Sequence, residues 1–164
     1  MAKKLNFGCG NDIRKGWDNV DIQKSKKLTK SFDFNKFPYP IRKDSYDYIY
    51  LSNVLEHLDK PYKVLDELWR IAKNKAIIEI IVPHYTNKGA YSDMQYQHFF
   101  NEECFELLEK QRKLIDKTNK FKIKELKLIP TLPGKFFPRF LREKLSLFIN
   151  GLISQIRAKI QVNK

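Results

Sequence analysis

The chain has 164 residues, enough for one domain that buries roughly 70% of the surface of its unfolded chain without metals or disulfides. Its two cysteines, Cys9 and Cys104, lie far apart in sequence, and the N-terminus lacks the apolar stretch of a signal peptide, which together favour a reducing cytoplasm. No apolar stretch approaches the roughly 20 residues that span a bilayer, so membrane contact would be peripheral. The net charge of +13 is concentrated in residues 110–164, which hold 15 basic and 3 acidic side chains.

The first predicted strand covers residues 4–7 and ends in a Gly-x-Gly turn. Gly8 and Gly10 can adopt positive φ and have no Cβ, so the backbone there can pass close to a ligand and offer it N–H groups. A second predicted strand, residues 19–22, contains Asp21, whose carboxylate could hold a ribose by paired hydrogen bonds. Together these features predict an adenosine-type cofactor.

The connection between these two strands is short. Asp21 follows Asn11 by only ten positions, too few for the full helix that links the first two strands of a dinucleotide-binding fold. A helix here would be a turn long or absent. This argues against a nicotinamide dinucleotide and suits a cofactor that lacks pyrophosphate.

The remaining elements are predicted from the spacing of apolar residues and from proline, asparagine and aspartate residues, which mark where elements begin or end. They are strands at 28–32, 46–51 and 76–82, a short helix at 54–58, a helix that Asp59 caps before Pro61, and a helix that Asn101 caps and that runs to about Lys117. Alternating strands and helices predict an α/β sheet with right-handed crossovers.

The order of these motifs resembles class I S-adenosylmethionine-dependent methyltransferases, in particular the short methyltransferase type 11 family. Residues 5–10 resemble the first glycine motif, and residues 19–21 resemble the strand that ends in the ribose-binding acid. Asp33 and Phe34 resemble the pair that contacts adenine. Residues 45–58 resemble the signature in which an aspartate-led strand runs into Val-Leu-Glu-His.

The resemblance implies a Rossmann-like, doubly wound, mostly parallel sheet that ends in a C-terminal antiparallel hairpin, for which 121–129 and 157–162 could supply the strands. It implies S-adenosylmethionine as the cofactor and methyl transfer as the activity. No two of the three histidines have the close spacing of a His-x3-His zinc site, so no metal is expected. The implied cofactor-binding residues are Asn6, Gly8, Cys9, Gly10, Asp21, Ile22, Asp33, Phe34, Ser52 and Asn53. Two departures stand out: Asn6 replaces the acid that often precedes the first glycine, and the N-terminal helices that usually cover the cofactor are missing, so the site is expected to be open or completed by a partner or by residues 84–100.

All three histidines are expected near the carboxyl ends of the strands, where ligands bind in open α/β sheets. With an ordinary pKa of about 6.5, a histidine can take a proton from a hydroxyl or amine as methylation proceeds. We therefore predict His84 and His98 as substrate-facing catalytic residues and His57 as a residue that lines the site. Each could instead be a capping or hydrogen-bonding residue, and Glu56 is an alternative base.

The C-terminal third contains a basic amphipathic segment at about 133–156, predicted as an insertion in a single domain of residues 1–164. Apolar residues at helical spacing predict a helix that continues to Ile156. Its apolar face could lie on an anionic membrane or cover the sheet of its own domain. The lysines are scattered rather than grouped in an aromatic-lined groove, so nucleic acid is the less favoured partner.

Three functional hypotheses follow. The first is a cytoplasmic enzyme, possibly membrane-peripheral, that methylates an oxygen or nitrogen of a small-molecule or glycan/lipid-linked acceptor. The second is a catalytically inactive cofactor-binding module that acts as a subunit or as a membrane or RNA-surface adaptor. The third is RNA methylation.

Overall fold

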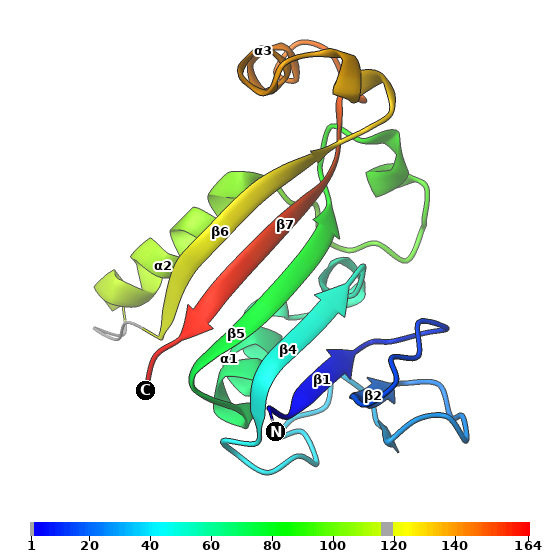
Figure 1. The fold of residues 1–164 in the computed structure, drawn as a ribbon, viewed down its shortest axis with the longest axis vertical. Helices are drawn as coiled ribbons and strands as arrows, with labels where there is room; N and C mark the ends of the chain where they lie inside the picture. The colour runs from blue at the N-terminus through cyan, green and yellow to red at the C-terminus, as the bar shows by residue number, and fades with distance from the viewer. Residues whose placement is uncertain (1, 116–119) are drawn as a thin grey trace.

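The computed structural model describes residues 2–115 and 120–164. Seven strands form one sheet with the order β3-β2-β1-β4-β5-β7-β6. Strands β1 to β5 are parallel, and β7 pairs antiparallel with both β5 and β6 (Figure 1). The strands are β1 (Lys4–Phe7), β2 (Asp18–Asp21), β3 (Lys30–Ser31), β4 (Tyr46–Ser52), β5 (Ala72–Pro83), β6 (Phe121–Pro130) and β7 (Ile153–Val162). This confirms the predicted methyltransferase-type sheet with its terminal hairpin.

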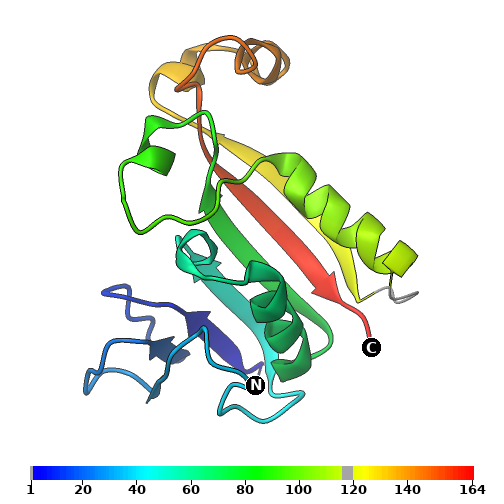
Figure 2. The same cartoon turned by 180° about the vertical axis from the view of Figure 1, so that it is seen from behind.

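Apolar side chains from alternate strand positions form the core. Leu5 and Phe7 of β1, Ile49 and Leu51 of β4, and their neighbours on β5 are at most 1% exposed. They belong to one buried apolar cluster with residues of α1 (Pro61–Ile71) and α2 (Glu102–Ile115). Figure 2 shows that both helices lie on the same face of the sheet. The apolar face of α1 packs there through Val64, Leu65, Leu68 and Ile71.

The opposite face carries no long helix among the described residues, as Figure 1 shows. The three connections between β1 and β4 are all irregular, in agreement with the short β1–β2 spacing.

Two buried asparagines hold the first of these connections in place. The Asn6 side chain donates to the Asp12 carbonyl oxygen and to Asn19 Oδ1, and Asn19 Oδ1 also accepts from the Arg14 N–H.

Several predicted boundaries need correction. Asp59 does not cap α1: Lys60 occupies the N-cap position without a side-chain hydrogen bond, and Asp59 Oδ1 instead accepts from Gln97 Nε2 at 3.1 Å. Asn101 does cap α2, because its Oδ1 accepts from the Cys104 N–H at 3.2 Å. The predicted end of this helix near Lys117 lies outside the described residues. The third strand is only two residues long, and the short helix after β4 is a 3₁₀ turn, η1 (Leu55–His57).

The C-terminal amphipathic segment also differs from the prediction. The helix α3 covers only Arg139–Leu145, and Ile156 belongs to β7 rather than to a helix. We call residues 131–152, which join β6 to β7 and include η3 (Pro133–Phe136) and α3, the tip segment. It projects beyond the end of the sheet (Figures 1 and 2), and α3 has no buried residue, so it does not cover the sheet. No helix among the described residues is long and apolar enough to cross a membrane.

Candidate active site

The glycine turn lies at the carboxyl end of the central strand β1. Gly8 has φ +67° and Gly10 has φ +48°, both in the left-handed region that favours glycine. A Cβ on Gly8 would collide with Val54, whereas a Cβ on Gly10 would meet no atom within 4 Å. The turn is therefore closely packed against Val54 at Gly8, whereas Gly10 faces open space that a ligand could occupy.

Asp21 ends the neighbouring strand and reaches the same turn. Its Oδ2 accepts from the Gly10 N–H at 2.7 Å, and its Oδ1 accepts from the Gln23 N–H at 3.1 Å. A carboxylate offers about four acceptor positions, so two remain for ribose hydroxyls. A cavity of about 170 Å³ adjoins Gly10 and Asp21. This volume is below the roughly 300 Å³ of an enclosing ligand pocket, so a nucleoside bound here would remain open on one side.

Four further residues predicted to bind the cofactor lie beneath or beside the turn. Asn6 is 2% exposed and is engaged in the hydrogen bonds that fix the β1–β2 connection. Cys9 is buried, which raises the pKa of its thiol. Phe34 is also buried, with its ring stacked on Phe7 at 3.9 Å, while Asp33 accepts from the Asn35 N–H at 2.9 Å. Asp33 thus shapes the loop, and Phe34 contributes to the core.

The remaining predicted contacts, Ile22, Ser52 and Asn53, follow or end strands at the carboxyl edge but are not among the residues that line the cavity beside Gly10 and Asp21. Ile22 follows Asp21 and is 57% exposed, so its side chain is free to lie against a flat ring. Ser52 and Asn53 end β4, and Asn53 holds a φ of +52°, which is unusual for a residue other than glycine. This geometry turns the chain sharply into η1 and exposes the Asn53 side chain, whose Oδ1 accepts from Gln155 Nε2 at 3.4 Å.

Glu56, in η1, has a carboxyl group that is both buried and without a hydrogen-bond partner. Its side chain is 1% exposed, and neither carboxylate oxygen has a hydrogen-bond partner. Burial raises the pKa of the Glu56 carboxyl to about 7. Its own carbonyl oxygen accepts from the N–H groups of Gln97 and His98, which brings the loop after β5 over η1. His98 Nε2 is likewise buried without a partner.

The other two histidines differ in their surroundings. His57 is partly exposed, and its ring meets Tyr96 edge-on at 4.7 Å. His84 is 2% exposed, and both of its ring nitrogens are engaged: Nδ1 lies 2.7 Å from Thr86 Oγ1, and Nε2 lies 3.3 Å from Glu102 Oε2. Burial lowers the pKa of His84 against the opposing effect of Glu102. The structure thus brings His57, His98 and Glu56 together through the loop after β5, and it places His84 in a closed hydrogen-bonded position. No group of metal-ligating side chains occurs among the described residues.

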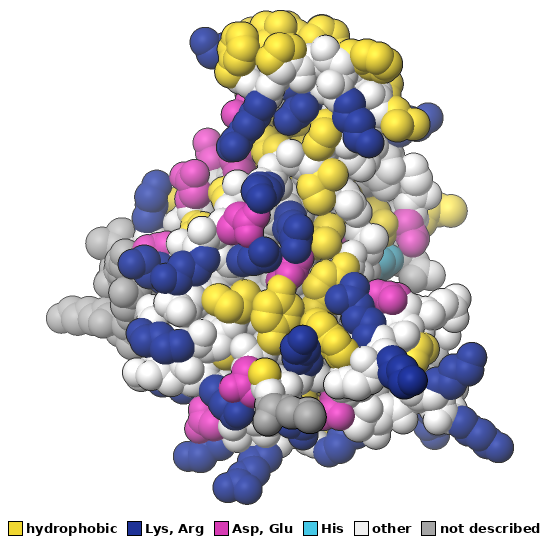
Figure 3. Space-filling view, in the orientation of Figure 1, with side chains coloured by type: hydrophobic (Ala, Val, Ile, Leu, Met, Phe, Trp, Pro, Cys, Tyr) yellow, Lys and Arg dark blue, Asp and Glu magenta, His cyan; other side chains and the backbone are white. Residues whose placement is uncertain are grey.

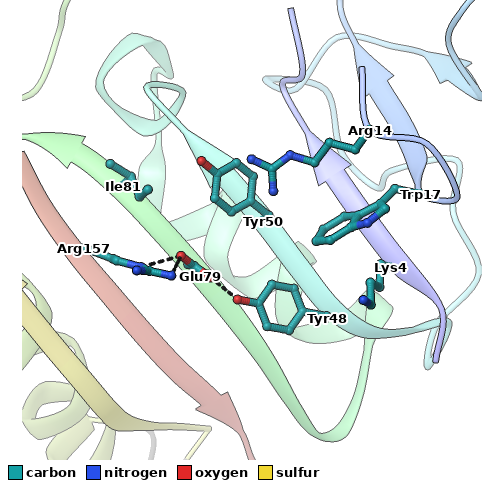
Figure 4. A pocket seen from close by; sticks show the side chains of 8 residues that line it. All are labelled: Lys4, Arg14, Trp17, Tyr48, Tyr50, Glu79, Ile81 and Arg157. Carbon is teal, nitrogen blue, oxygen red and sulfur yellow. Dashed lines mark hydrogen bonds and ion pairs between the residues drawn. The ribbon is translucent and has the colours of Figure 1, made fainter. Parts of the chain in front are cut away.

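A second cavity, of about 530 Å³, lies on the uncovered face of the sheet and was not predicted from the sequence (Figure 4). Glu79, at its floor, is 4% exposed and is held by the Arg157 guanidinium and by the Tyr48 hydroxyl group. The Arg14 guanidinium lies 3.6 Å from the centre of the Tyr50 ring. Arginine and aromatic side chains here replace the helix that covers this face in a doubly wound sheet. The two halves of the Glu79–Arg157 pair are 78 residues apart in sequence, so no local pattern could have indicated it.

Comparisons with known proteins agree with this arrangement. Residues 9–80 match the sequence profile of a family described as "Methyltransferase domain". This range contains Gly10, Asp21, Asn53 and Glu56. No curated protein sequence matches the chain.

Solved structures share the fold over nearly the whole chain. An S-adenosylmethionine-dependent methyltransferase from Archaeoglobus fulgidus has a TM-score of 0.65 at 18% identity, with 97% of this chain and 86% of that chain covered. A putative sarcosine dimethylglycine methyltransferase from Galdieria sulphuraria has a TM-score of 0.65 at 15% identity, with 99% and 78% covered. One from Mesorhizobium loti, also S-adenosylmethionine-dependent, has a TM-score of 0.64 at 13% identity, with 98% and 90% covered. At these identities the likeness establishes the fold.

Proposed function

We propose that this chain, which carries an S-adenosylmethionine-dependent methyltransferase domain, transfers the methyl group to an oxygen or nitrogen atom of its acceptor. The observation that carries this proposal is the unpartnered, buried carboxyl of Glu56 beside the carboxyl edge of the sheet. Methylation of a hydroxyl or amine releases a proton, and a group with a pKa of about 7 is well matched to accept it near neutral pH.

The residues at the carboxyl edge fit the cofactor. Gly10 leaves open space above the turn, Asp21 retains acceptor positions for ribose hydroxyls, and the exposed Ile22 offers an apolar surface for adenine. When bound, S-adenosylmethionine supplies the electrophilic methyl group, so the protein mainly has to align the acceptor and to receive its proton. We assign Gly8, Gly10, Asp21, Ile22, Ser52 and Asn53 to the cofactor.

The proton would pass to Glu56, assisted by the side chains that the loop after β5 brings over η1. His98 is the candidate to share this proton, because its backbone N–H bonds the Glu56 carbonyl oxygen and its Nε2 is buried without a hydrogen-bond partner. His57 lines the acceptor side next to Tyr96. His84 is better suited to positioning the loop than to proton transfer, because both ring nitrogens are already engaged.

For the acceptor we retain a small-molecule or glycan/lipid-linked compound in the cytoplasm. The shallow cofactor cavity supports an acceptor that approaches an open edge rather than one enclosed in a deep pocket. Lysines without aromatic rings line the two cavities beside Asp21 and β3, whereas binding of single-stranded RNA relies on aromatic rings for base stacking, and this supports such an acceptor over RNA at that site.

The cofactor assignment is tested by calorimetric titration with S-adenosylhomocysteine. Asp21→Ala removes the ribose acceptor and should weaken binding by at least about tenfold. Glu103→Gln also removes one negative charge, but at an exposed position in the first turn of α2, and should leave binding unchanged. Failure of the wild-type protein to bind would overturn the proposal and leave the non-catalytic module as the better description.

The proton-transfer assignment has a separate readout. Glu56→Gln keeps the size of the side chain but cannot accept a proton. It should bind S-adenosylhomocysteine like the wild type while losing transfer of a radiolabelled methyl group to acceptors in a cell extract, with an expected loss of about 100-fold or more. Unchanged transfer by this variant would remove Glu56 from the mechanism without affecting the cofactor assignment.

A further inference from the structure

In the tip segment (131–152), large apolar side chains are exposed, while several polar groups make hydrogen bonds within the segment. Large apolar side chains point outward: Phe136 is 89% exposed, Phe148 87%, Leu132 75%, Leu147 71% and Phe140 67%. Globular proteins rarely gather so many large apolar side chains at one exposed place, and such patches mark interaction sites. Figure 3 shows these apolar side chains massed at the extreme end of the molecule.

The polar groups of the same segment are used internally. Thr131 Oγ1 donates to the Gly151 carbonyl oxygen and accepts from the Gly134 N–H, and Arg142 Nη1 donates to the carbonyl oxygens of Gly134 and Phe137. A Cβ on Gly134 would come within 1.9 Å of the Leu152 carbonyl oxygen, so the two ends of the segment touch closely. The apolar side chains are therefore displayed on a braced structure rather than on a loose loop.

The tip segment is basic, and its exposed cations, Lys135, Arg139 and Lys144, are here called the basic collar. The segment contains four basic residues and one acidic residue, a net charge of +3. Lys135, Arg139 and Lys144 are exposed, and Glu143 is paired with Arg139 at 2.8 Å. Figure 3 shows Lys and Arg side chains directly below the apolar end. A protruding apolar end with a basic collar is complementary to a bilayer, in which acyl chains lie beneath anionic headgroups.

We propose that the tip segment docks on membranes rich in anionic phospholipids, with Phe136, Phe140 and Phe148 inserted into the interface and the basic collar at the level of the phosphates. The net positive charge of the segment favours an anionic bilayer over a second copy of this chain, whose tip segment has the same charge. This inference concerns binding to membranes and does not depend on methyl transfer.

Docking would also orient the enzyme. The tip segment is joined to the loop that follows β5, because the Gly151 N–H bonds the Thr86 carbonyl oxygen; close by, the His84 N–H bonds the carbonyl oxygen of Ser154 in β7. That loop begins at the carboxyl edge and carries further exposed apolar side chains, namely Tyr91, Met94 and Phe99. A docked protein would thus turn its carboxyl edge toward lipid, where a lipid-linked acceptor resides; this last step rests on the proposed function.

Vesicle flotation tests the docking. The wild-type protein should float with vesicles of phosphatidylcholine and phosphatidylglycerol, and much less with phosphatidylcholine alone. The double variant Phe136→Ala/Phe148→Ala should bind at least about tenfold more weakly, because it removes two exposed apolar anchors. Leu107→Ala removes an apolar side chain that is 45% exposed on α2, outside both the tip segment and the loop after β5, and serves as the control.

A charge variant tests the collar. Lys135→Glu/Lys144→Glu should weaken binding to the anionic vesicles by at least about tenfold, whereas Lys122→Glu/Lys124→Glu, on exposed positions of β6, should have a smaller effect. Circular dichroism checks that each variant stays folded, and calorimetry checks that it still binds S-adenosylhomocysteine.

Two outcomes would overturn the proposal. One is wild-type protein that does not float with either kind of vesicle. The other is a concentration-dependent dimer that the Phe136→Ala/Phe148→Ala variant dissociates while vesicle binding is absent, which would assign the patch to a second copy. Retained binding of S-adenosylhomocysteine in either case would leave the methyltransferase assignment intact.

Discussion

Val54 lies directly against Gly8: a Cβ on this glycine would come within 2.4 Å of Val54 Cγ2. The end of β4 and the turn after β1 therefore fit together only with glycine at position 8. Gly10 has a similar left-handed φ but faces open space. The two glycines thus differ in what they do, although they look equivalent in the sequence.

Gly8→Ala should lower the free energy of unfolding by about 2–4 kcal/mol, because it combines backbone strain with overpacking. Gly10→Ala should lower it by only about 1 kcal/mol, the cost of the left-handed φ. Urea denaturation of both variants measures the difference. Equal losses would contradict the packing described at Val54.

Glu56 should make stability depend on pH. Burial raises the pKa of its carboxyl from the ordinary value of 4.5 to about 7 in the folded protein, so the folded state binds the proton more tightly than the unfolded chain does. Stability should fall as pH rises from about 4.5 to about 7, by up to about 3 kcal/mol, and stay level above that range.

Glu56→Gln removes this ionisation and should be more stable than the wild type above pH 7. The measurement is urea denaturation at several pH values. If the free energy of unfolding changed with pH in the same way for the variant and the wild type, the ionisation of Glu56 would not be coupled to folding.

Arg157 should stabilise the folded state because its guanidinium neutralises the buried Glu79 carboxylate. Arg157→Ala leaves the Glu79 carboxylate buried with the Tyr48 hydroxyl as its remaining partner, and we expect a loss of about 2–4 kcal/mol in the free energy of unfolding. Lys159→Ala, two residues along the same strand, breaks a more exposed pair with Glu125 and should cost less than about 1 kcal/mol.

The double variant Glu79→Gln/Arg157→Ala separates the pair from the arginine itself. It should recover part of the loss, because no buried charge is then left without its cation. If the double variant were no more stable than Arg157→Ala, the loss of stability would come from the packing of the arginine side chain and not from the unpaired carboxylate.

The positions of the longer strands and the residues of the carboxyl edge were predictable because they depend on short, local patterns, whereas the terminal antiparallel hairpin was expected only from the resemblance to class I methyltransferases. The buried runs at β4 and β5, the glycine turn and Asp21 each identify themselves within a few residues. The C-terminal helix was mispredicted because Leu152 and Ile156 continue the helical spacing of α3 although they belong to the far end of the tip segment and to β7. Gly151, with φ +84°, separates the two elements, and this glycine was the available signal.

Other features arise only from tertiary contacts. Asp59 looked like a helix cap but bonds a glutamine 38 residues away. The isolation of the Glu56 carboxyl depends on the loop at 97–98 closing over η1, and the pairing of Glu79 depends on a strand from the opposite end of the chain. Local periodicity contains no information about such partners.

The one-sided helix cover has a practical spectroscopic consequence. The chain has two tryptophans: Trp17 lies on the uncovered face beside Tyr48, and Trp69 lies in α1 on the covered face, where its Nε1 donates to the Asn163 carbonyl oxygen at 2.8 Å. Each face of the sheet therefore has its own intrinsic fluorophore. With Trp69 replaced by phenylalanine, the emission of the remaining indole would report on the connection that follows the glycine turn, without any added label.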